Sequence, residues 1–168
     1  DAIEILKQRK REILKDDSIK RVAHKIFEYN GEIHTTAVGK STGGDLVIFE
    51  GPKPNVKYRI GVDGTGTDKQ TTDSKKKKSK YSVSVTKLFD HEPDARSYCD
   101  VAEFTIEPEK QEECFRLTFL ICRLYNKYDN CKILPEGNIG TAPAIVGYFE
   151  NRGGLKMMLK QPKYLGTD

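Results

Sequence analysis

The order of apolar patterns after the break at Gly51-Pro-Lys-Pro54 constrains the fold more than any other feature of the chain. Short runs rich in β-branched and aromatic residues are typical of strands, whereas apolar residues that recur every three or four positions are typical of helices. The strand patterns cover Lys57–Val62, Tyr81–Phe89, Tyr98–Ile106 and Cys131–Leu134. The helix patterns cover Pro108–Tyr125 and Thr141–Asn151. The predicted order is three strands, a helix, a strand and a helix.

This order predicts an α/β fold with a mixed sheet. The first three strands are joined by short connections and therefore form an antiparallel meander. The fourth strand follows a helical crossover, so it runs parallel to a strand of the same sheet, and the first strand is its expected neighbour. The helices are then expected to flank the sheet, and the first and fourth strands end at the same edge.

An acidic residue follows each of these two strands, at the point where the strand meets a glycine turn. Asp63 lies in Tyr58-Arg-Ile-Gly-Val-Asp-Gly-Thr-Gly66, and Glu136 lies in Ile133-Leu-Pro-Glu-Gly-Asn-Ile-Gly140. Ligands of open α/β sheets bind in the crevice outside the carboxyl ends of the strands. Because carboxylate oxygens suit Mg²⁺ and Mn²⁺, the pair predicts a site for divalent cations.

The residues around the two acids fit such a site. Gly64 and Gly66 let the backbone turn tightly beside a metal, and Asn138 and Gly140 can do the same after the second acid. The helix that begins at Thr141 offers backbone N–H groups to a phosphate. Taken alone, each acid also fits a structural role as a turn residue or an exposed loop acid.

A block of lysines lies between the first two core strands. It comprises Lys75, Lys76, Lys77 and Lys78, followed by Lys80. One interpretation is the solvated tip of a long loop, and the other is a contact with DNA phosphates, which adds affinity without sequence preference.

Composition narrows the class of protein further. Hydrophobic residues make up 36% and charged residues 32% of the 168 residues, and no apolar run is long enough for a membrane span. Residues 1–20 are too charged for a signal peptide. Four cysteines without metal-ligand spacing predict reduced, buried thiols and a cytoplasmic protein. No membrane partner is expected.

The first third of the chain has weaker patterns. Apolar residues among many charges predict a helix over Ala2–Lys15, and a short strand is expected around Asp45–Phe49. We interpret residues 1–54 as a lead-in or linker segment and residues 55–168 as the core domain.

The strand and helix order and the two acidic motifs resemble the nuclease domain of tailed-phage terminase large subunits, a family with a ribonuclease H-like fold. The resemblance rests on Gly61-Val-Asp-Gly-Thr-Gly66 and on Pro135-Glu-Gly-Asn-Ile-Gly140 followed by a helix, and it covers roughly Tyr58 to Asp168. It implies that residues 1–54 lead in from an upstream ATPase domain and that residues 55–168 form the nuclease domain, truncated at its C-terminus.

The resemblance also implies an activity. Phage or prophage terminases cut double-stranded DNA during genome packaging in the bacterial host cytoplasm, so Asp63 and Glu136 would be catalytic ligands of two Mg²⁺ or Mn²⁺ ions. The implied partners are double-stranded DNA, the terminase ATPase domain, the portal protein and the small terminase subunit.

The chain departs from this family at two places. The family commonly carries an aspartate immediately before the Tyr-Ser pair of the second strand, where this chain has Lys80, and Asp68 or Asp73 could substitute. The family's third catalytic acid comes from a helix that would lie beyond Asp168, so we expect an under-occupied metal site, which would leave residues 1–168 inactive by themselves. Two alternatives stay open: a resolvase or transposase-like nuclease of the same fold, and a non-catalytic DNA-binding or assembly module.

Overall fold

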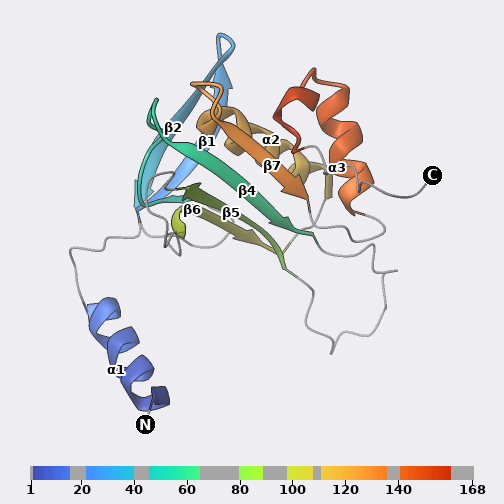
Figure 1. The fold of residues 1–168 in the computed structure, drawn as a ribbon. Helices are drawn as coiled ribbons and strands as arrows, with labels where there is room; N and C mark the ends of the chain where they lie inside the picture. The colour runs from blue at the N-terminus through green and yellow to red at the C-terminus, as the bar shows by residue number, and fades with distance from the viewer. Residues whose placement is uncertain are drawn as a thin grey trace.

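The computed structural model describes residues 2–15, 22–39, 46–64, 80–88, 98–107, 111–135 and 141–159. Its core is a seven-stranded mixed sheet with the strand order β2-β1-β3-β6-β5-β4-β7 (Figure 1). The strands are β1 (Ala23–Tyr29), β2 (Glu32–Gly39), β3 (Leu46–Ile48), β4 (Lys57–Asp63), β5 (Tyr81–Leu88), β6 (Tyr98–Ile106) and β7 (Cys131–Pro135). The helices are α1 (Ala2–Lys15), α2 (Gln111–Tyr125) and α3 (Thr141–Glu150), followed by a 3-10 turn, η1 (Leu155–Met157).

The predicted arrangement of the core strands is confirmed. β4, β5 and β6 form an antiparallel meander, and β7 pairs with β4 in parallel after the α2 crossover. In this parallel pair Tyr58 lies beside Cys131 and Val62 lies beside Pro135. Beyond β7, the N–H of Leu159 donates to the carbonyl of Ile133 at 2.9 Å, so the chain after α3 lies along the outer edge of β7.

The sheet also continues on the N-terminal side of Pro54, although the sequence patterns placed the core domain after that residue. β1 and β2 form a hairpin whose two-residue turn, Asn30-Gly31, has positive φ at both positions (51° and 78°). These φ values suit a tight hairpin turn, in which Asn-Gly is a favoured pair. β3 then joins the hairpin to the core because it pairs with β1 on one side and with β6 on the other.

The two faces of the core sheet differ in polarity. Tyr58, Ile60 and Val62 of β4 are buried, whereas the alternate residues of that strand are exposed or half-buried. The buried residues pack beneath α2 and α3, as the edge-to-face contact between Tyr58 and Tyr125 illustrates. The opposite face is polar and carries no helix within the described part of the chain, a common arrangement for sheets that are largely antiparallel.

α2 is fixed to the sheet by polar as well as apolar contacts. The hydroxyls of Tyr81 and Thr118 lie 2.7 Å apart in the core, and Thr118 also donates to the carbonyl of Cys114 at 2.7 Å. Burial raises the pKa of the Tyr81 phenol, which therefore remains neutral over the physiological range. The Tyr125 hydroxyl donates to the carbonyl of Glu50 at 2.7 Å and connects the end of α2 to the segment before β4.

The cysteines agree with the sequence prediction at three of four positions. Cys114, Cys122 and Cys131 are buried free thiols, and burial raises the pKa of Cys114 to about 11. The prediction of a buried thiol is wrong for Cys99, which is exposed near the start of β6. None of the described helices is long and apolar enough to cross a membrane.

Candidate metal centre at the end of β4

Asp63 is the last residue of β4 and lies on the polar face of the sheet. It is exposed, and Ser82 of β5 lies directly opposite it in the antiparallel register. Side chains at opposed positions of neighbouring strands share one face of the sheet. Gly61, two residues earlier on the same face, adds no side chain beside the carboxylate. Asp63 is therefore accessible to a ligand that approaches from solvent.

The next residue, Gly64, packs against the start of α3. A Cβ atom at Gly64 would lie 2.2 Å from Cγ2 and 2.9 Å from Oγ1 of Thr141. Thr141 is the first residue of α3 and is almost fully buried, at 2% exposure. The end of β4 and the N-terminus of α3 are thus in direct contact, and only glycine fits between them without a shift.

The parallel register brings the end of β7 to the same edge. Val62 pairs with Pro135, and the residues that follow these two in the sequence are Asp63 and Glu136. Glu136 lies outside the described residues. The edge itself therefore combines the end of β4, the end of β7 and the beginning of α3.

Three of the predicted site residues can be located: Asp63, Gly64 and Lys80. Lys80 is exposed and immediately precedes β5, two residues before Ser82. The other predicted site residues lie outside the described residues: Gly66, Asp68, Asp73, Lys75, Lys76, Lys77, Lys78, Glu136, Asn138 and Gly140.

The donor set at this edge suits a hard divalent cation, since an exposed carboxylate supplies oxygen ligands. Within the described ranges no group of three or more His, Cys, Asp and Glu side chains could hold a metal ion. Asp63 supplies one carboxylate there, and a complete site needs further ligands, of which Glu136 is the predicted one.

Sequence reasoning missed two contributors to this edge. Ser82 can be found from the strand pattern once the register of β4 and β5 is known, because it is the position that faces Asp63. The contact between Gly64 and Thr141 has no sequence signal beyond the glycine, since it depends on where α3 returns to the sheet.

No family model matches the chain, and no curated protein matches it either.

Proposed function

We propose that this chain is a divalent-metal-dependent endonuclease domain of ribonuclease H-like fold that cleaves double-stranded DNA, of the kind found in phage terminase large subunits. The observation that carries the proposal is the parallel register of β4 and β7, in which Val62 lies beside Pro135. In the sequence each of these two residues is followed by an acidic residue, and two carboxylates at one sheet edge would suit two-metal phosphodiester hydrolysis.

The order of the elements supports the same fold. Three antiparallel strands are followed by a helical crossover to a strand parallel to the first, and the chain after α3 returns beside β7 in parallel again. The β1–β2 hairpin and β3 extend this core beyond β6.

In this proposal Asp63 and Glu136 hold Mg²⁺ or Mn²⁺. When bound, these ions would activate the attacking water and stabilise the leaving oxygen of the phosphodiester. The N-terminus of α3, which contacts Gly64, would place the positive end of the helix dipole near a phosphate oxygen.

The partners and the setting follow from the same proposal. Double-stranded DNA would approach the polar face of the sheet at the end of β4, and the lysines at positions 75–78 and 80 would add salt-dependent contacts to phosphate. A terminase nuclease would act with an ATPase domain, a portal protein and a small terminase subunit, in the cytoplasm of a bacterial host.

One observation favours a second candidate, a non-catalytic DNA-binding module. Lys80 is a cation at the position where the terminase pattern has an acid, and it is exposed beside the start of β5. A cation there would favour DNA binding and disfavour metal binding.

The test separates these two functions. Nicking of supercoiled plasmid would be measured with Mn²⁺, with Mg²⁺ and with chelator, for this chain and for a chain extended past Asp168, and Mn²⁺ binding would be measured by calorimetry. Asp63→Asn and Glu136→Gln should each abolish nicking and weaken Mn²⁺ binding while duplex affinity is retained. Asp100→Asn is the matched control, because Asp100 is an exposed acid of β6 whose partner is Thr86. Normal nicking by Asp63→Asn, or no Mn²⁺-dependent nicking by the chain extended past Asp168, would contradict the nuclease proposal.

A further inference from the structure

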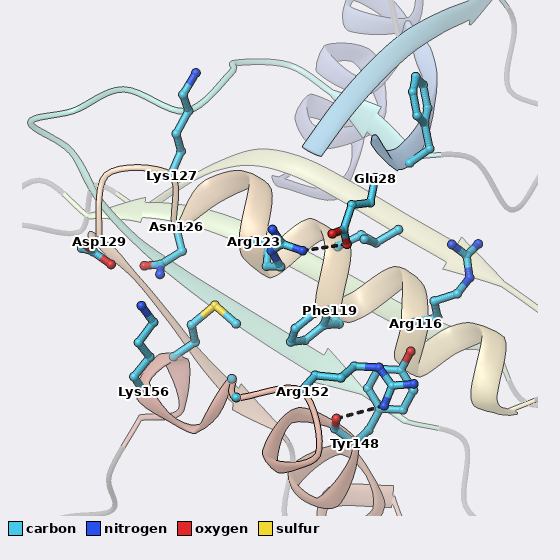
Figure 2. Close-up of a pocket in the computed structure, with 15 residues that line it drawn as sticks. Glu28, Arg116, Phe119, Arg123, Asn126, Lys127, Asp129, Tyr148, Arg152 and Lys156 are labelled. Carbon is cyan, nitrogen blue, oxygen red and sulfur yellow. Dashed lines mark hydrogen bonds and ion pairs between the residues drawn. The ribbon is translucent and has the colours of Figure 1, made fainter. Parts of the chain in front are cut away.

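A groove of about 960 Å³ lies on the helical side of the sheet, between α2 and the α3–η1 segment and next to the end of β1. We call it the basic groove, and its principal residues are Arg116, Phe119, Arg123, Tyr148, Arg152 and Lys156. Figure 2 shows Lys127 and Lys156 at one end, Arg116 and the guanidinium of Arg152 at the other, and Phe119 between them. The volume lies near the upper end of the range for ligand pockets in proteins.

Positive charge dominates this lining. Five cations, Arg116, Arg123, Lys127, Arg152 and Lys156, face two carboxylates, Glu28 and Asp129. Two of the cations are already paired: the Arg116 guanidinium bonds Glu113 at 2.6 and 2.9 Å, and Arg123 bonds Glu28 at 2.7 Å.

The remaining three cations are available for a ligand. Within the part of the chain that the structure describes, Lys127, Arg152 and Lys156 form no ion pair with a carboxylate. An acidic ligand would therefore gain three new charge contacts without breaking an ion pair between described residues.

The floor of the basic groove is apolar. Phe119, Leu120 and Met157 line it and belong to the hydrophobic core. Phe27, at the rim, is 42% exposed, which is high for a phenylalanine. An apolar floor with a cationic rim complements a ligand that carries both apolar and acidic groups.

Nucleic acid fits these features less well than protein. Bases bind single-strand grooves by stacking on open aromatic faces, but two aromatic rings of this groove already stack on other side chains. The Arg152 guanidinium lies 3.5 Å from the centroid of the Tyr148 ring, and the Phe27 ring stacks on His34 at 5.7 Å. A duplex binds mainly through its phosphates, which an apolar floor does not complement.

We infer that the basic groove binds an acidic, amphipathic segment of a partner protein, with its apolar side chains on the floor and its carboxylates on Lys127, Arg152 and Lys156. A second copy of this chain is a poorer occupant. Its helix α1, which exposes apolar side chains, carries five basic and two acidic residues and would be repelled by the rim.

The test uses fluorescence anisotropy with a short synthetic peptide that alternates glutamate with leucine. The comparison probes are a peptide of equal charge with glutamine in place of leucine, and a short DNA duplex. The double variant Lys127→Glu, Lys156→Glu is compared with Lys7→Glu, Arg11→Glu, which changes the net charge equally on exposed positions of α1.

The groove variant should weaken binding of the glutamate–leucine peptide by roughly tenfold, and the α1 variant should leave it within about twofold. The glutamine peptide should bind more weakly than the leucine peptide to the unmodified chain. No binding of the leucine peptide, or equal loss in both variants, would overturn the inference. Loss of duplex binding in the groove variant while peptide binding stays intact would also overturn it, because the groove would then bind DNA. Self-association that only the groove variant abolishes would overturn it as well, because the occupant would then be a second copy of the chain.

Discussion

Replacing Gly64 by alanine tests the contact between the end of β4 and the Thr141 side chain at the start of α3. The new Cβ would lie 2.2 Å from Cγ2, 2.7 Å from Cβ and 2.9 Å from Oγ1 of Thr141. Carbon atoms prefer separations of about 3.5 Å or more, so the start of α3 must move by about 1 Å. Such overpacking of a filled site costs about 1–3 kcal/mol. Gly64 has no positive φ, so backbone strain adds nothing to this cost.

A double-mutant cycle isolates the contact from other effects of the substitution. Thr141→Gly removes all three atoms that the new Cβ would meet, although it also sacrifices the buried side chain of Thr141. Gly64→Ala should therefore destabilise the unmodified chain by about 2 kcal/mol and the Thr141→Gly background much less, giving a coupling energy of about 1 kcal/mol or more. Equilibrium unfolding in urea measures each free energy of unfolding.

Gly147→Ala is the matched control within α3. A Cβ at Gly147 would meet no heavy atom within 4 Å, and alanine is the better helix former, so this variant should gain about 0.5–1 kcal/mol. The reasoning is refuted if Gly64→Ala has no cost, or if its cost is the same in both Thr141 backgrounds.

Three further predictions concern contacts that hold the sheet and helices together. Hydrogen bonds from Lys87 and Lys53 lower the pKa of Glu50. The ionised carboxylate therefore stabilises the fold above its unfolded pKa near 4.5, and this stabilisation is lost as the pH falls through the folded pKa. Unfolding curves from neutral to acid pH should therefore show a smaller loss of stability for Glu50→Gln than for the unmodified chain. Thr118→Val should cost about 1–3 kcal/mol in urea unfolding, because it leaves the Tyr81 hydroxyl buried without its partner, and an unchanged midpoint would contradict this. Arg123→Ala should increase amide hydrogen exchange in the β1–β2 hairpin more than in β5, because Arg123 donates to that hairpin at two points; uniform protection would contradict it.

The core of the fold was predictable because its signals are local. The apolar periodicity of α2 and the short strand β7 could be located from the sequence alone, and a helical crossover leaves a parallel pairing as the simple solution. This reasoning placed Asp63 at a strand end and chose the correct neighbour for β4. The N-terminal helix α1 was predicted with the bounds that the structure has.

The N-terminal strands were harder to place because their partners are distant in the sequence. β3 has only three residues, and it joins the core through β6, more than fifty residues later. The Asn30-Gly31 pair is a local hairpin signal, so the β1–β2 turn is the feature of these strands that can be predicted from neighbouring residues alone. Pro54 interrupts the chain but not the sheet, so a rigid break in sequence was a poor guide to where the sheet begins.

The alternation of side chains along β4 explains why residue 63 faces solvent and residue 64 faces the helices. Val62 faces the core, so Asp63 faces the polar side of the sheet, where a metal or a phosphate can reach it. Residue 64 turns back toward the helices, where Thr141 leaves no room for a Cβ. A shift of the β4 register by one residue would bury the carboxylate beneath α3 and expose Val62. The exposure of the Asp63 carboxylate and the need for glycine at position 64 thus both follow from the register of β4, and a substitution at either position tests the same edge of the sheet.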